Sequence, residues 1–219
     1  MKPNGLFKNI WSEIKSWFFQ GEKIDFFKNA EILGIRQNSR SLIFDFFNRQ
    51  ILFSKNGIDD VKGQPLTDAV KDVLCQYLLM CPDPIFESSN RLVTLREFSD
   101  SGPLFSSFTA NTGKIIGTTF SGSLENLINR CLTLDGIIMK NVSYDLSVRF
   151  KALSRIPIIL NFNDQDDMMP ANAGFLFQDN ADKYLDLECL SIICTYLTGQ
   201  LIQQVPGWSG TYVKSVSNP

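Results

Sequence analysis

The stretch 159-ILNFNDQDDMMPANAGFLFQDNADKYL-185 places an acidic segment between two short apolar runs. The apolar runs are too short for helices, and Pro170 interrupts any continuous helix between them. We therefore predict two buried strands at residues 156–162 and 174–177, paired antiparallel and connected by residues 163–173. Connections of this length are commonly either functional or fixed by their own packing, so this loop bears on function as well as on the fold.

The rest of the chain between residues 22 and 205 contains both strand-like and helix-like patterns. Runs of β-branched and aromatic residues predict strands, and apolar residues at intervals of three and four predict helices. The expected strands are 30–35, 41–47, 50–54, 91–98 and 142–148, and the expected helices are 66–80, 102–136 with a break at 121–122, and 186–203. Strands in two groups with helices between them indicate an α+β fold with mostly antiparallel strands in a single domain.

The two ends of the chain differ from this domain. Residues 5–19 carry seven apolar side chains at helical spacing, which predicts an amphipathic N-terminal helix within residues 1–21. Such a helix packs on its own domain, on a second copy of the chain, or on a membrane surface, and its few cations disfavour the last alternative. Residues 206–219 are expected to form a C-terminal tail after the domain of residues 22–205.

Composition excludes several classes of function. The chain has 219 residues, a net charge of −2 and no histidine. The charge disfavours nucleic acid as a partner, because phosphate binding needs a concentrated cationic face. The absence of histidine excludes Ser-His-Asp and Cys-His catalysis and any histidine-ligated metal. Five cysteines without a CxxC pair, and no apolar run of membrane-spanning length, favour a soluble cytoplasmic protein.

Four charged residues are the candidate ligand-binding residues: Arg96, Asp164, Asp166 and Asp167. The aspartates follow a predicted strand, where they can orient a polar ligand or a hard cation, or form an ordinary solvated turn. Arg96 stands in an apolar run, so it is expected to pair with one of these aspartates. The alternative is a clamp for an anionic ligand. The acidic stretch lacks the central Gly and the final Glu of a calcium-binding loop. The residues around Lys114 do not match the pattern of a phosphate-binding loop.

The acidic segment and its flanks also resemble a known family. Four features in a row resemble an uncharacterised prokaryotic family, domain of unknown function 3786. They are the proline-led strand at Pro157, the acidic stretch, the apolar strand ending at Phe177, and the pattern of Ala181, Tyr184 and Leu185. Upstream, the segments LCQYLL and LVTLREF match the same family, so that the resemblance spans roughly residues 25–203. Since that family has no established activity, the resemblance implies no particular reaction.

Three hypotheses for function remain open at this stage. The first is a ligand-binding or accessory module that uses the acidic loop and Arg96. The second is an enzyme that uses a divalent metal held by carboxylates or a bound cofactor, although neither a metal-ligand set nor a cofactor is assigned. The third is a protein-interaction module, or a homo-oligomer, that associates through residues 5–19. The partner is accordingly either a small molecule or another protein.

Overall fold

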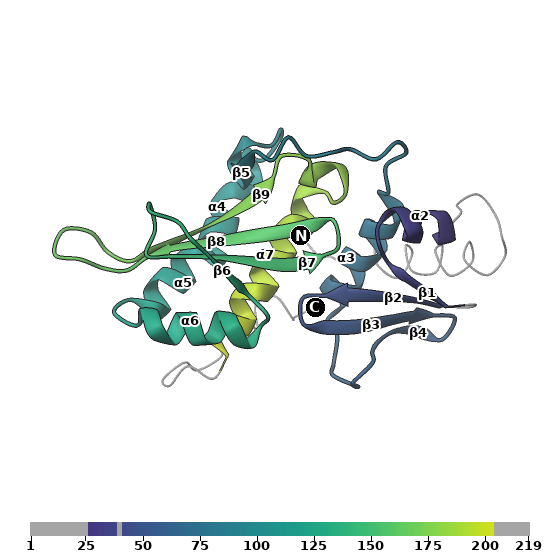
Figure 1. The fold of residues 1–219 in the computed structure, drawn as a ribbon, viewed down its shortest axis with the longest axis horizontal. Helices are drawn as coiled ribbons and strands as arrows, with labels where there is room; N and C mark the ends of the chain where they lie inside the picture. Colours follow the sequence, from purple (N-terminus) through teal and green to yellow (C-terminus); the bar gives the residue numbers. More distant parts are fainter. Residues whose placement is uncertain (1–25, 39–40, 204–219) are drawn as a thin grey trace.

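The computed structural model of the protein describes residues 26–38 and 41–203, and Figure 1 shows their arrangement. The helix expected over residues 5–19 and the tail expected over 206–219 lie outside the described residues. The described part forms two antiparallel sheets with helices packed against them, as the sequence patterns predict. One continuous hydrophobic core joins the two sheets.

The larger sheet has five strands in the order β5-β9-β8-β7-β6, and every neighbouring pair is antiparallel. Its strands are β5 (Leu92–Thr94), β6 (Ile137–Met139), β7 (Leu146–Leu153), β8 (Ile156–Asn163) and β9 (Asn172–Gln178). The first seven residues of β8 are buried, as expected for a central strand. The pairing of β8 with β9 confirms the strand pair predicted from the acidic stretch, with residues 164–171 as the connection.

The smaller sheet is a meander of four strands: β1 (Arg36–Asn38), β2 (Ser41–Phe46), β3 (Arg49–Ser54) and β4 (Gly57–Asp60). Alternate residues of β2 are buried, which is the pattern of a strand with one face on the core. The β2–β3 hairpin confirms the pairing predicted across residues 48 and 49. Strand β2 also lies against β7, so the two sheets meet within one domain (Figure 1).

One predicted strand is wrong. Residues 30–32 belong to helix α2 (Phe26–Ile32), and the chain turns at Gly34 before β1 begins at Arg36. The apolar residues Ala30 and Leu33 are three positions apart, so a helix buries both of them on one face. The positive φ of Gly34 permits the turn, because glycine has no Cβ to clash there.

The remaining helices are α3 (Asp68–Leu79), α4 (Gly102–Asn111), α5 (Gly113–Phe120), α6 (Leu124–Thr133) and α7 (Leu187–Ile202). Two short 3-10 helices are η1 (Leu95–Glu97) and η2 (Ala181–Lys183). The side chains of Thr67 and Asp186 cap the N-termini of α3 and α7 by accepting backbone hydrogen bonds. The predicted break at residues 121–122 separates α5 from α6.

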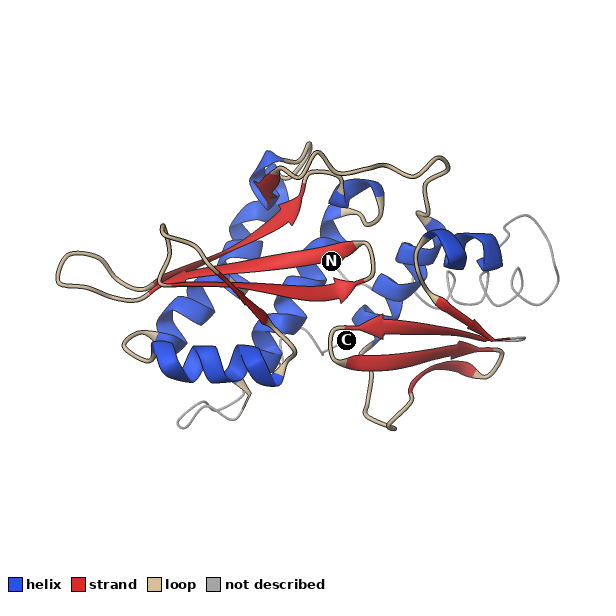
Figure 2. Cartoon of the chain, in the orientation of Figure 1, coloured by secondary structure: helices blue, strands red, loops and turns tan. Residues whose placement is uncertain are grey.

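Helices α4 to α7 cover one face of the five-stranded sheet, and α3 lies between α7 and the smaller sheet (Figure 2). Helix α7 contacts α3, α4, α5 and α6, and it is therefore the central helix of the domain. Its core-facing side is apolar and buried: Leu190, Ile193, Cys194, Leu197 and Leu201. The opposite side of α7 is less buried than this core-facing side.

Candidate functional site

Two of the three aspartates of the acidic loop accept backbone hydrogen bonds that hold the loop in place, and the third, Asp167, is exposed. Oδ1 of Asp164 accepts a hydrogen bond from the backbone N–H of Gly122 at 2.6 Å. Oδ1 of Asp166 accepts from the backbone N–H groups of Met168 and Met169 at 2.8 and 2.7 Å. These two bonds hold the pKa of Asp166 below its usual value. The carboxylates of Asp164 and Asp166 are thus directed to backbone groups and do not converge on a cleft.

The loop has a fixed base and an exposed tip. The hydroxyl of Ser121 donates to Oε1 of Gln165 at 2.8 Å, which ties the loop to the turn between α5 and α6. Beyond this point the loop protrudes from the end of β8 and β9 (Figure 1). Within residues 26–38 and 41–203, no group of three or more acidic or cysteine side chains is gathered closely enough to hold a metal ion.

The expected pairing of Arg96 with these aspartates is wrong. Strand β5 ends at Thr94, and Arg96 lies in η1 with an exposed side chain. A capping box between Thr94 and Glu97 ends the strand, and this turn directs Arg96 outward. Its guanidinium lies over the ring of Phe105, 5.7 Å from the ring centroid, and no ion pair of the described residues joins it to the acidic loop.

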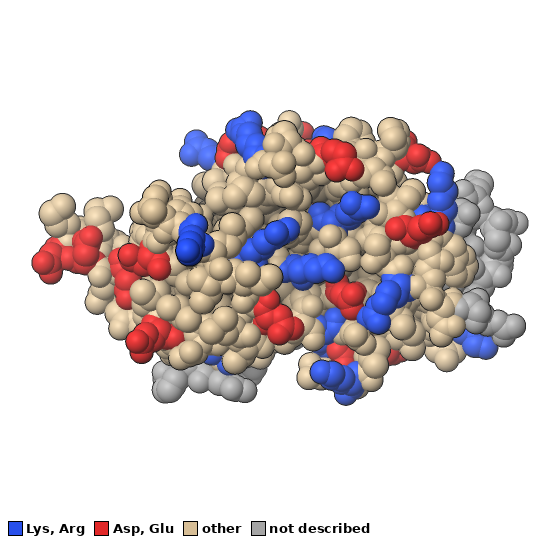
Figure 3. All heavy atoms as spheres, in the orientation of Figure 1, with Lys and Arg blue, Asp and Glu red and all other residues tan. Residues whose placement is uncertain are grey.

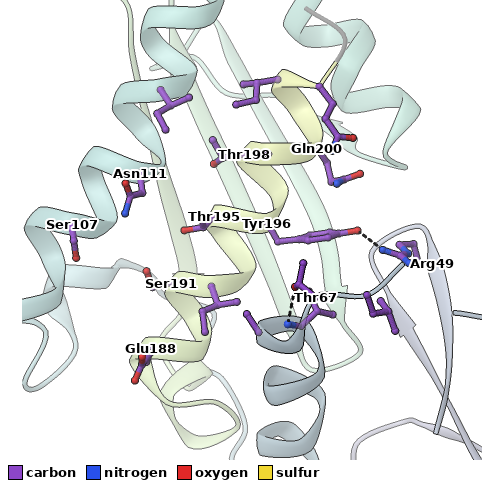
Figure 4. A pocket seen from close by; sticks show the side chains of 18 of the residues that line it. Arg49, Thr67, Ser107, Asn111, Glu188, Ser191, Thr195, Tyr196, Thr198 and Gln200 are labelled. Atoms are coloured by element: carbon purple, nitrogen blue, oxygen red, sulfur yellow. Dashed lines mark hydrogen bonds between the residues drawn. The ribbon is translucent and has the colours of Figure 1, made fainter. Parts of the chain in front are cut away.

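The structure instead reveals a pocket of about 520 Å³ on the outer side of α7. Figure 4 shows that α7 forms its floor, with Ser107 and Asn111 of α4 on one side and Thr67 and Arg49 on the other. A volume of this size falls within the range of pockets that bind small organic molecules. Its apolar lining residues are Pro65, Leu66, Ala69, Val70, Leu104, Ile115, Ile192 and Ile202.

The pocket exists because the outer side of α7 carries small residues. Ser191, Thr195 and Gly199 recur every four residues and therefore lie on one face of the helix. Their short side chains leave an open space on this face, whereas leucines fill the corresponding space on the opposite face. This run of small and hydroxyl residues within an otherwise apolar helix is the sequence signal for the pocket, and it is not among the predicted site residues.

Arg49 occupies one end of the pocket and is held by a buried ion pair. Its Nε donates to Oδ2 of Asp60 at 2.9 Å, and the two side chains are only 11% and 2% exposed. Its Nη2 donates to the backbone oxygens of Gln64 and Pro65. Burial opposes both charges, but the hydrogen bonds from Arg49 and from backbone N–H groups outweigh it and lower the pKa of Asp60. The site therefore keeps a fixed, charged guanidinium.

One donor of this guanidinium remains available to a ligand. Nη1 of Arg49 donates one hydrogen to the hydroxyl oxygen of Tyr196 at 3.3 Å. A guanidinium has five N–H groups, and within the described residues its other Nη1 hydrogen has no partner. The hydroxyl of Tyr196 likewise donates to no acceptor in the part of the chain that the structure describes. Two hydrogen-bond donors, from Arg49 and Tyr196, therefore stand together on the pocket wall (Figure 4).

Further polar groups line the pocket without partners among the described residues. These are the side chains of Asn111, Ser191, Thr195 and Gln200. A bound molecule can satisfy them, because each is partly exposed to the pocket. The cysteines add no nucleophile here: Cys75, Cys189 and Cys194 are buried, and burial raises the pKa of each thiol. The arrangement is suited to binding an amphipathic molecule.

Comparison with protein families assigns the chain to a family. A family model described as a domain of unknown function (DUF3786) matches residues 25–200. The chain therefore belongs to this family, which confirms the resemblance seen in the sequence. Comparisons with curated proteins and with solved structures gave no match. None of the helices in the described ranges combines the length and the apolar character that a membrane span requires.

Proposed function

We propose that this member of the family is a binding module that takes up a small organic molecule in the α7 pocket. The observation that carries the proposal is the pairing of an apolar trough with polar groups that have no partner among the described residues. Apolar lining supplies most of the binding free energy in such sites, and a few fixed polar groups set the orientation of the ligand. Both features meet on the outer face of α7.

The pocket favours a ligand with an apolar body and an oxygen acceptor at one end. Nη1 of Arg49 and the hydroxyl of Tyr196 supply two adjacent donors for a carboxylate, sulfonate or carbonyl oxygen. Asp60 already compensates the charge of Arg49, so a neutral acceptor binds there as well as an anion. Leu104, Ile115 and other apolar side chains then cover the body of the molecule.

The proposal includes a cytoplasmic location and assigns no reaction. The five cysteines are all free, which fits a reducing compartment. The described pocket offers hydroxyls, amides, the carboxylate of Glu188 and one compensated arginine, and these groups bind and orient a molecule. Accordingly, the acidic loop and Arg96 have no part in this site, because neither lines the pocket.

Titration with anilinonaphthalene sulfonate tests the proposal, because this dye combines an apolar ring system with one anionic oxygen group. We expect a single saturable site and a rise in dye fluorescence. Thr195→Trp fills the trough, and it should weaken dye binding by about tenfold or more. Tyr196→Phe removes one donor, and it should weaken binding by a smaller factor.

Thr133→Trp provides the matched control, since it adds the same ring at an exposed position on α6 outside the pocket. It should bind the dye as the original protein does. Circular dichroism confirms that each variant is folded. If folded Thr195→Trp binds the dye with unchanged affinity, the α7 pocket is not the binding site and the proposal fails.

A further inference from the structure

The tip of the acidic loop exposes two methionines beside two carboxylates. Met168 and Met169 are 87% and 61% exposed, and Asp166 and Asp167 precede them directly. The hydrogen bonds to Asp166, and one from the backbone N–H of Asp166 to the oxygen of Met169 at 3.0 Å, fix the shape of the tip. Large apolar side chains that a rigid loop holds in solvent are a common feature of contact surfaces.

A second surface with the opposite charge lies on the open face of the five-stranded sheet, away from the helices. Arg149 and Lys151 alternate with buried residues along β7, so both project from this face. Within the described residues, neither has an ion-pair partner. The register places Ile137 of β6, which is 67% exposed, directly opposite Arg149.

The two surfaces are complementary: the loop tip is acidic and the sheet face is basic, and each exposes apolar side chains. Figure 3 shows basic side chains across the middle of this face and acidic side chains at the end from which the β8–β9 loop protrudes. The loop extends away from its own sheet and is tied to α5 and α6 at its base (Figure 1). It is therefore positioned to contact the sheet of another copy, and not its own.

We propose that the β8–β9 loop of one copy docks on the open face of the five-stranded sheet of a second copy. Asp166 and Asp167 then face Arg149 and Lys151, and the methionines cover Ile137 and its neighbour Met139. The two surfaces differ, so this contact is head-to-tail and extends into chains at high concentration unless rotation closes a ring. The contact is small, which makes the association weak and sensitive to salt.

Sedimentation velocity of the full chain tests the proposal. At low salt we expect the weight-average sedimentation coefficient to rise with protein concentration, and at high salt we expect that rise to shrink. Two variants each remove one surface: Asp167→Asn with Met168→Ser alters the loop and leaves Asp166 in place, and Arg149→Glu with Lys151→Glu alters the sheet face. Each variant alone should associate at least about tenfold more weakly than the original chain.

Mixing the two variants gives the sharper result. The intact loop of the sheet variant still fits the intact face of the loop variant, so the mixture should form one-to-one dimers and stop there. A control with Lys55→Glu and Lys62→Glu changes the same charge at exposed positions in the turns on either side of β4, and it should associate as the original chain does.

Three outcomes would overturn the inference. The first is an original chain that stays monomeric at every concentration. The second is association that persists in both variants, which would point to residues 5–19 or another surface. The third is a mixture of folded variants that fails to associate although the original chain does. All six altered positions are exposed, so each variant should fold, and its melting temperature checks this.

Discussion

Arg49 is the residue that joins the smaller sheet to the pocket. Its partner Asp60 is almost fully buried, so removal of the guanidinium leaves an uncompensated carboxylate in the protein interior. We expect Arg49→Met to lower the free energy of unfolding by about 3–5 kcal/mol. Urea denaturation monitored by circular dichroism measures this change.

Two further variants distinguish the ion pair from a general loss of packing. Arg36→Met breaks an exposed pair with Asp45 and should cost less than about 1 kcal/mol. Arg49→Met combined with Asp60→Leu removes both charges, and it should recover most of the lost stability. Equal costs for Arg49→Met and Arg36→Met would contradict the structural role of this pair.

The raised pKa of Asp72 should make the stability of the protein depend on pH. Burial raises its pKa to about 6, and the nearby carboxylates of Asp68 and Glu188 add to the rise. One of its carboxylate oxygens has no hydrogen-bond partner among the described residues. Between the usual Asp pKa of 3.8 and about 6, the folded chain retains a proton that the unfolded chain has released. This stabilisation is therefore greatest at low pH and is lost as the pH rises through that window.

Replacement of this carboxyl group should reverse the penalty at neutral pH. Asp72→Asn should stabilise the protein above pH 6 by about 1 kcal/mol, a modest value because the side chain is partly exposed and water screens its charge. Below pH 4 the difference should vanish. Urea denaturation across this pH range checks both statements, and Asp59→Asn controls for loss of a charge at an exposed position. A stabilisation that is constant with pH would contradict the assignment.

At the scale of elements, α5 packs on β9 with backbone against backbone. A Cβ added to Gly113 would lie 2.3 Å from the backbone oxygen of Ala173, and one added to Gly117 would lie 2.9 Å from that of Ala171. This close approach explains why glycine precedes Lys114, in a segment that only superficially resembles a phosphate loop. Any side chain at Gly113 must push the helix from the strand.

We therefore expect Gly113→Ala to destabilise the fold by about 2 kcal/mol, even though alanine favours helices. The matched control is Gly199→Ala in α7, where an added Cβ meets no atom within 4 Å. That change should leave stability unchanged or raise it by about 0.5–1 kcal/mol. Melting temperatures of both variants provide the measurement, and a neutral Gly113→Ala would show that α5 is free to move away from β9.

Elements with a strong local pattern could be predicted from the sequence, and short or polar ones could not. The apolar runs of β8 and β9 and the capped helices α3 and α7 were found because each has a clear period and clear ends. Strand β4 was missed because its sequence, GIDD, is mostly polar. Arg96 was placed in a strand because its apolar neighbours continue past Thr94, whereas a capping box ends β5 at that residue.

At the scale of the whole molecule, the sequence carries a local signal for only one wall of the pocket, the small residues of α7. Arg49, Thr67, Ser107 and Tyr196 come from four separate segments that only the tertiary fold brings together. Sequence reasoning therefore selected the acidic loop, whose charges stand together in the chain. The loop and the pocket lie in different parts of the molecule, and the contact proposed for the loop is independent of ligand binding in the pocket.

Methyl NMR of isoleucine side chains during a titration with anilinonaphthalene sulfonate shows whether a ligand binds in the α7 pocket. Ile115, Ile192 and Ile202 line the α7 pocket, whereas Ile137 and Ile138 lie on the exposed edge strand β6. We expect saturable shifts of the first three methyl signals, with the two signals from β6 unchanged. Shifts confined to β6, or three pocket signals that stay unmoved while the dye binds, would contradict a ligand site on α7.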